Sequence, residues 1–311
     1  SYIGRLEITG RDGLELLNRL STNDMDRITS PNQGIYTVLT SNKGRILDLL
    51  FVTRLESHLV VLTGAENRKK IIDWIEFYTF TEDVTVQDVT EETAMLSVMG
   101  NGASQILDDI TGEAISSLPR GNSVIAYIYG VKTLILRTDF VNLPGFDIIV
   151  SSSDAEQIWT HLLSNRTDQD IKPVGMDAME IIRIEQGVPL FGKELTENAN
   201  PLEANLLEFI SFSKGCYVGQ EVVARLNTYK KVQKYLVGLS LDNDYGSITD
   251  ADLFIEGRRV GNITSSVKSP GLGTTIGLGY VSKAHAKPGV VMTIGSSGKQ
   301  AIAHIEKLPF R

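Results

Sequence analysis

Apolar residues recur along this chain with two periodicities, one typical of helices and one typical of strands. In residues 11–20 (RDGLELLNRL) three leucines stand at the spacing of one helix face, which predicts an amphipathic helix. Residues 34–41 (GIYTVLTS) and 46–55 (ILDLLFVTRL) are apolar runs on either side of Asn-Lys-Gly at 42–44. That pattern is typical of a β-hairpin with a glycine-containing turn.

Elements of both kinds follow, and the pattern changes near Gln233. We expect strands at 58–64, 92–100, 145–151 and 208–213, a hairpin at 123–137, and helices at 65–78, 103–109, 154–164, 176–187 and from Val218 onward. From Gln233 the chain consists of short alternating or apolar runs separated by Gly, Pro and Ser. This pattern predicts a compact all-β C-terminal domain, either a small barrel or a sandwich.

Length and composition limit the classes of function. A chain of 311 residues is longer than one compact core usually holds, so we expect two or three domains. No apolar run reaches the roughly 18–20 residues of a membrane helix, and the first residues lack the layout of a signal peptide. A single cysteine cannot form an internal disulfide, which favours a cytoplasmic protein, or one inside an organelle with any leader already removed. The net charge of -8 disfavours nucleic acid as a partner, but a small anionic ligand needs only a local group of cations.

The single cysteine lies in the stretch SKGCYVGQEVVAR, residues 213–225. A helix that begins near Val218 would place Cys216 just before a helix N-terminus, where backbone N–H groups and the helix dipole favour a thiolate. Lys214 would add positive charge, as would Arg225 if the helix folds back. The alternative is that Cys216 is a small apolar residue in a crowded turn.

Charged residues interrupt the apolar pattern at two further places. Asp48 stands in the apolar strand ILDLLFV, and an unpaired buried carboxylate is costly. Its side chain should therefore face water or point into a cleft that uses it. Arg183 and Glu185 lie on different faces of the helix expected at 176–187, so they are not an obvious pair. They either fix that helix through salt bridges or serve a binding site.

The stretch Lys214–Glu221 (KGCYVGQE), followed by Ala224-Arg225, resembles the signature of the YgfZ-type folate-binding proteins. Those proteins assist the assembly or repair of iron–sulfur clusters and belong to the larger glycine cleavage T-protein (aminomethyltransferase) superfamily. The resemblance extends over almost the whole chain, through GRDGLELLNRLSTNDM, GIYTVLTSNKGRILDLLFV, GMDAMEIIRIEQGVPLFGKEL and GRRVGNITSSVKSPGLGTTIGLGYV in that order. Where the T-protein hairpin ends in Asp-Asp-Leu, this chain has Asp48 followed by Leu49.

The resemblance implies an α+β fold in which three domains form a T-protein-like ring around a central folate channel, with an all-β barrel as the C-terminal domain. Residues 1–50 and 138–232 would form a discontinuous folate-binding domain, residues 51–137 a second α+β domain, and residues 233–311 the barrel. The implied ligand is tetrahydrofolate or a one-carbon derivative of it.

The resemblance also implies site residues. Cys216, Lys214 and Asp48 would carry the chemistry, Cys216 as a functional thiol with Lys214 beside it and Asp48 near the reactive nitrogens of the folate. The residues expected to contact the folate or to shape its site are Tyr36, Asp48, Arg183, Glu185, Tyr217, Gln220, Glu221 and Arg225.

Two functions follow from these residues. The first is a tetrahydrofolate-binding accessory protein for the assembly or repair of iron–sulfur proteins, whose partners are folate and an iron–sulfur client or assembly protein. Since a cluster takes about four protein ligands, Cys216 could contact one only together with a partner. The alternative is a folate-dependent aminomethyl or methyl transferase, in which Asp48 stabilises positive charge at an amine. A third possibility is a binding protein without chemistry.

Overall fold

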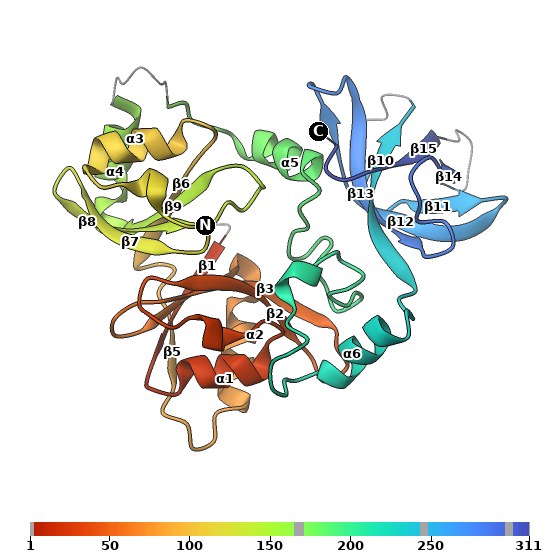
Figure 1. Cartoon of the computed structure of the whole chain (residues 1–311). Coiled ribbons are helices and arrows are strands. Elements are labelled where there is room, and N and C mark those ends of the chain that lie inside the picture. Colours follow the sequence, from red (N-terminus) through yellow and green to blue (C-terminus); the bar gives the residue numbers. More distant parts are fainter. Residues whose placement is uncertain (1–2, 165–170, 243–247, 296–300, 311) are drawn as a thin grey trace. The chain divides into compact units, whose positions relative to one another are not determined.

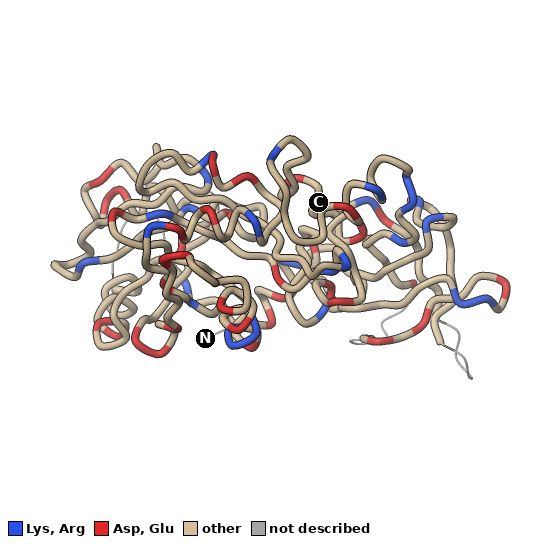
Figure 2. The backbone as a smooth tube through the Cα atoms, turned by 90° about the horizontal axis from the view of Figure 1, so that it is seen from below, with Lys and Arg blue, Asp and Glu red and all other residues tan. Residues whose placement is uncertain are grey.

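A computed structural model describes residues 3–164, 171–242, 248–295 and 301–310 (Figure 1). The chain divides by its internal contacts into two units. The first unit comprises residues 1–40, 48–173 and 209–218, and the second comprises residues 41–47, 174–208 and 219–311. None of the described helices is long and apolar enough to cross a membrane. Acidic and basic positions are interspersed along the backbone in the view of Figure 2.

The first unit contains two sheets. One has the strand order β2-β3-β4-β1-β5, and the other has the order β6-β9-β8-β7. The strands of the first sheet are β1 (Ile3–Thr9), β2 (Gly34–Thr40), β3 (Ile46–Arg54), β4 (Leu59–Gly64) and β5 (Thr85–Asp88). Those of the second are β6 (Thr93–Met99), β7 (Ser123–Ile128), β8 (Val131–Arg137) and β9 (Gly145–Ser151). The predicted hairpins at 34–55 and 123–137 are confirmed as β2–β3 and β7–β8.

Helices cover these sheets, and apolar side chains join the sheets to each other. The helices are α1 (Gly13–Leu20), α2 (Arg68–Phe77), α3 (Ala103–Thr111) and α4 (Ala155–Ser164), with short 3-10 helices η1 (Met25–Arg27), η2 (Ala65–Asn67), η3 (Ile115–Ser117) and η4 (Ser152–Asp154). On one face of the second sheet, residues such as Ile148 pack with α3 and α4. On its other face, Leu136 and Ile149 pack with Phe51 and Leu62 of the first sheet.

The second unit carries α5 (Met176–Glu185), η5 (Leu207–Phe209, whose last residue belongs to the first unit), α6 (Gln220–Thr228) and a closed barrel. The barrel strands, in the order in which they pair, are β10 (Lys234–Leu241), β13 (Thr274–Ser282), β12 (Arg258–Ser269), β11 (Asp252–Ile255), β14 (Val291–Ile294) and β15 (Ala301–Glu306). Its interior is filled by buried aliphatic residues such as Leu239, Ile263 and Ile305. The predicted all-β C-terminal domain is confirmed, and it is a barrel.

Two predictions about individual elements are wrong, and strand β1 was not predicted. Residues 208–213 form no strand, because their backbone bonds instead to the loop after α1, where the Ser211 N–H donates to the Thr22 carbonyl at 2.9 Å. The last helix begins at Gln220 and not near Val218, since Gly219 has a φ of 84°, which no helix accommodates. Strand β1 was not expected from the pattern, because Arg5 interrupts its apolar alternation and is nevertheless 1% exposed.

Candidate functional site

The turn that carries the single cysteine is held on both sides. Before Cys216, the Lys214 ammonium donates to three backbone carbonyls, those of Asn18 at 2.6 Å, Ser21 at 3.0 Å and Asn23 at 2.5 Å. After it, the Val218 N–H donates to the Arg19 carbonyl at 2.9 Å, and the Thr40 hydroxyl donates to the Val218 carbonyl at 2.6 Å. The turn is thereby fixed to the end of α1 and the end of β2, while the Cys216 side chain remains exposed.

Lys214 positions this turn and is not available to the sulfur. An ammonium group has three N–H donors, and all three are committed to carbonyls. Burial lowers the pKa of Lys214 to about 8, an effect that the nearby Asp24 and Asp26 carboxylates partly oppose. Because α6 begins only at Gln220, Cys216 also lies outside the first helical turn, where the helix dipole acts. Of the sources of positive charge expected for Cys216, the Lys214 ammonium and a helix N-terminus are therefore not available to its sulfur.

The two tyrosines predicted to contact a folate both lie in the first unit. Tyr217 is 8% exposed, and burial raises the pKa of its hydroxyl to about 12. Tyr36 lies on β2, and its ring centroid is 4.9 Å from that of Phe51 and 5.3 Å from that of Phe209. Its hydroxyl donates to the Thr138 carbonyl at 3.4 Å. We call Tyr36, Phe51 and Phe209 the aromatic cluster.

A buried carboxylate that the sequence reasoning missed belongs to the same unit. Asp147 on β9 accepts hydrogen bonds from the Ser97 hydroxyl at 2.5 Å and the Thr138 hydroxyl at 2.7 Å. Burial raises the pKa of Asp147, although both hydrogen bonds act in the opposite direction. Asp147 also contributes, after burial, to the raised pKa of Tyr36. The signal in the sequence was available, because Asp147 interrupts the apolar strand GFDIIVS just as Asp48 interrupts ILDLLFV.

Asp48 takes neither of the two orientations expected for it. Its side chain is buried at 1% exposure, and its two carboxylate oxygens accept four hydrogen bonds. The donors are the Thr63 hydroxyl, the Gly64 N–H at 2.9 Å, the Asn67 amide at 3.1 Å and the Leu49 N–H at 2.8 Å. Burial raises the pKa of Asp48 against these hydrogen bonds. In this arrangement the carboxylate ties β3 to the end of β4 and to η2, and it presents no oxygen to solvent.

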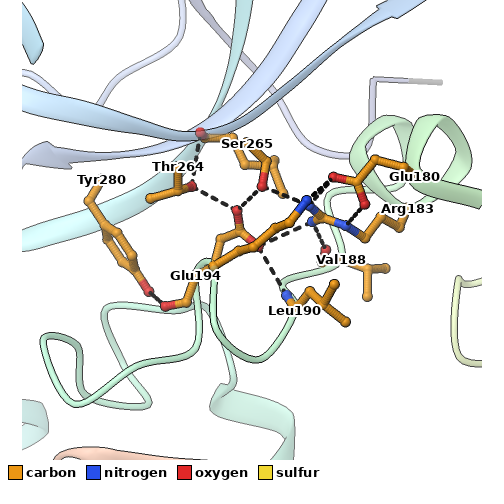
Figure 3. A network of polar contacts seen from close by, with 10 residues as sticks. Glu180, Arg183, Val188, Leu190, Glu194, Thr264, Ser265 and Tyr280 are labelled. Atoms are coloured by element: carbon orange, nitrogen blue, oxygen red, sulfur yellow. Dashed lines mark hydrogen bonds and ion pairs between the residues drawn. The ribbon is translucent and has the colours of Figure 1, made fainter. Parts of the chain in front are cut away.

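Arg183 lies in a buried polar network of the second unit (Figure 3). Its five N–H donors meet five acceptors, namely both Glu180 carboxylate oxygens at 2.6 Å, the Val188 carbonyl at 3.0 Å, Glu194 Oε2 at 3.1 Å and Ser265 Oγ at 2.7 Å. Glu194, whose side chain is 0% exposed, also accepts from the Thr264 hydroxyl at 2.7 Å. The network ties α5 and the loop after it to β12, so Arg183 has no donor left for a ligand.

Glu185 joins α5 to the barrel by a hydrogen bond. The remaining predicted residues, Gln220, Glu221 and Arg225, lie on α6. The Ser269 hydroxyl donates to Glu185 Oε1 at 2.5 Å, and the Phe310 N–H donates to its carbonyl at 2.8 Å. The salt-bridge interpretation of α5 thus describes Arg183, which forms ion pairs with Glu180 and Glu194, whereas Glu185 is held by hydrogen bonds. On α6, Gln220 is half-buried, whereas Glu221 and Arg225 are exposed.

The predicted site residues therefore fall into separate groups. Lys214, Cys216 and Tyr217 share one turn of the first unit, and Tyr36 contacts Phe209 at the start of the same segment. Among the residues that the structure describes, Asp48 has hydrogen bonds to none of the other predicted residues.

Comparison with known families covers both the α+β part and the barrel. Residues 1–214 match the family model "GCVT N-terminal domain", and residues 234–311 match "Glycine cleavage T-protein C-terminal barrel domain". The chain belongs to the glycine cleavage T-protein family.

Curated T-protein relatives align with the whole chain. The aminomethyltransferase of Desulforamulus reducens is 32% identical over 311 residues, which are 100% of this chain and 85% of that relative. The aminomethyltransferase of Bacillus pumilus is 30% identical with the same coverage. The crystal structure of the glycine cleavage system aminomethyltransferase T from Bartonella henselae superposes with a TM-score of 0.87 at 24% identity, over 100% of this chain and 84% of that one. This last likeness shows that the fold is that of a T-protein.

Proposed function

We propose that the chain binds a reduced folate, tetrahydrofolate or a one-carbon derivative of it, and acts in the transfer of a one-carbon unit. The observation that carries this proposal is the match to T-protein relatives named aminomethyltransferase, such as one that is 32% identical over 100% of this chain and 85% of the relative. Both family domains are matched, so the likeness is not confined to one half of the chain. The ring around a central channel and the three domain boundaries given above are part of this proposal.

The aromatic cluster is the part of the first unit whose chemistry fits a pterin ring. Tyr36 and Phe209 are half-buried residues whose rings contact one another, and aromatic rings of this kind can stack on a flat heteroaromatic ring. The Tyr36 hydroxyl is a polar group at the edge of the same cluster. The folate would supply the nitrogens that carry the one-carbon unit. In the second unit, Arg225 on α6 is exposed, and a guanidinium can pair with an anionic group.

Asp48 can act on this chemistry only through its charge. With four donors on its oxygens and 1% exposure, it is placed to fix the β3–β4 junction and not to exchange a proton with a ligand. Its negative charge would favour a cationic amine on the reaction path. Asp48→Asn would then lower the transfer rate more than it lowers folate affinity.

The experiment that tests the proposal has two readouts. Tetrahydrofolate binding is measured by the ligand-induced rise in melting temperature, because a ligand that binds the folded state stabilises it. Phe209→Ala should weaken this binding, whereas Tyr127→Ala, which removes an exposed tyrosine of the same unit, should not. One-carbon transfer is then measured with aminomethyl and methyl donors. Failure of tetrahydrofolate to bind the folded chain would rule the proposal out.

The exposed cysteine favours a second candidate, an accessory role for iron–sulfur proteins of the YgfZ kind. Its supporting observation is that Cys216 is exposed on a turn held by Lys214 and Val218, within the stretch KGCYVGQE. The partner would be an iron–sulfur client or assembly protein, which would share any cluster contact because one thiolate does not hold a cluster.

Substitution at two positions separates the two candidates. Cys216→Ser should lower the activity of an iron–sulfur client under oxidative stress while folate binding and one-carbon transfer persist. Asp48→Asn should lower transfer and leave the client unaffected. Normal client activity with Cys216→Ser, in a strain that lacks the native protein, would exclude the accessory role.

A further inference from the structure

Two cations of the second unit converge on one backbone carbonyl. Lys234, the first residue of β10, donates from Nζ to the Asn198 carbonyl at 2.9 Å. Arg45 approaches the same oxygen from Nη1 at 3.5 Å. The Lys234 ammonium also lies 4.5 Å from the centroid of the Tyr280 ring, which holds it by a cation–π contact. The two positive groups are therefore fixed close together, although they come from segments distant in the sequence.

Most N–H donors of this pair have no acceptor among the described residues. An ammonium carries three N–H groups and a guanidinium five. Within the part of the chain that the structure describes, the one acceptor of Lys234 is the Asn198 carbonyl. Arg45 donates to the same carbonyl and also forms an ion pair with Glu203 at 3.6 Å. The Arg45 side chain is 43% exposed, so its remaining N–H groups can be reached from solvent.

Positive charge exceeds negative charge around Lys234. Glu203 is the neighbouring carboxylate, and its Oε2 already accepts the Asn200 N–H at 3.1 Å. Arg259 is a further cation, paired with Asp252 at 2.7 Å. Burial lowers the pKa of Lys234, Arg45 and Arg259 lower it further, and Glu203 opposes them. A bound anion would compensate this charge and would take up the unused donors.

We propose that Arg45 and Lys234 form a binding site for an oxyanion, either a carboxylate or a phosphate group. Arg45 can present two parallel N–H groups to such a ligand, and Lys234 adds a point charge with its free N–H groups. The site is independent of the folate proposal, because neither residue is assigned to folate. Its ligand is either free phosphate or the carboxylate end of a larger metabolite, two sources that offer the same chemistry.

The test uses inorganic phosphate and glutarate as probes. Each is titrated into the full chain by calorimetry at an ionic strength held constant with chloride, so that general screening does not vary. We expect saturable binding of at least one probe at one site per chain, and the tighter probe identifies the source. Arg45→Gln and Lys234→Gln should each weaken this binding about tenfold, the effect of losing one charge-assisted hydrogen bond. Lys307→Gln removes an exposed lysine of the same unit and should bind as the unmodified chain does.

A measurement on the unmodified chain tests the proposal even if the variants fold poorly. The pKa of the Lys234 ammonium is followed by NMR with and without the bound probe, and it should rise because a neighbouring anion favours the charged form. Lys234→Arg keeps the charge and should retain binding. The proposal would be overturned if neither probe showed saturable binding, if both Gln variants bound the probe as tightly as the unmodified chain does, or if the pKa of Lys234 were unchanged at saturation.

Discussion

Arg183→Met should destabilise the second unit far more than removal of an exposed arginine does. The substitution removes five hydrogen bonds from a side chain that is 4% exposed. It leaves the Glu194 carboxylate, 0% exposed, without its cation. Breaking a buried ion pair by removing one partner costs about 3–5 kcal/mol.

The structure places the expected loss at the lower end of that range. Glu194 keeps three donors, the Leu190 N–H at 3.0 Å and the hydroxyls of Thr264 and Ser265 at 2.7 and 2.6 Å. Glu180 is 26% exposed and keeps its ion pair with Lys193 at 2.6 Å, so that end of the network can be rehydrated. We therefore expect a loss of about 3 kcal/mol in the free energy of unfolding.

Urea unfolding followed by far-UV circular dichroism measures this loss. The matched control is Arg259→Met, which breaks a 2.7 Å ion pair with Asp252 between side chains 60% and 43% exposed and should cost less than about 1 kcal/mol. Hydrogen exchange should show loosening at β12 in Arg183→Met. Arg183→Lys should not restore stability, because an ammonium cannot reach five acceptors. Equal losses for Arg183→Met and Arg259→Met would refute the claim that this network fixes α5 to the barrel.

Four further outcomes can be checked on the same protein. Asp48→Asn should lower the free energy of unfolding by about 1–3 kcal/mol in urea, since an amide cannot accept from all four donors. Gly219→Ala should lower the thermal midpoint more than Gly257→Ala does, because both glycines have positive φ but only at Gly219 would the added carbon lie 2.4 Å from a carbonyl oxygen. The pKa of Lys214 is about 8 in the folded chain, against 10.5 for an unperturbed lysine. Between these two pH values the unfolded chain binds more protons than the folded chain does, so the free energy of unfolding should rise with pH. Lys214→Met should lack this pH dependence. Cys216 is exposed, so a maleimide should modify it in the native protein about as fast as in urea, whereas protection of the native thiol would contradict its placement.

Most elements could be predicted from hydrophobic periodicity, and the exceptions have physical causes. The β2–β3 and β7–β8 hairpins and the barrel follow local patterns and turn residues. Strand β1 was missed because Arg5 looks like a surface residue, yet its guanidinium is satisfied by groups such as the Thr93 carbonyl, 88 positions away. The prediction of a strand at 208–213 was wrong because an apolar run does not show which backbone segment its N–H and carbonyl groups will hydrogen-bond to.

The candidate site was harder to predict, since its geometry depends on distant partners. The sequence marks Asp48 as an unusual residue in an apolar strand, but its burial depends on donors such as Asn67 in a different element. Arg183 was open to two interpretations, and the partner that decides between them, Ser265, lies 82 positions away. Cys216 could be recognised as unusual by its neighbours, but only the structure shows that Lys214 points at three carbonyls and not at the sulfur.

Equilibrium titration with tetrahydrofolate under anaerobic conditions measures whether this chain binds a reduced folate. We expect saturable binding at one site per chain, weakened by Phe209→Ala and unaffected by Tyr127→Ala. A folded chain that binds no tetrahydrofolate would show that this chain is not a folate-binding protein, and equal binding without Phe209 would show that the aromatic cluster is not the pterin site.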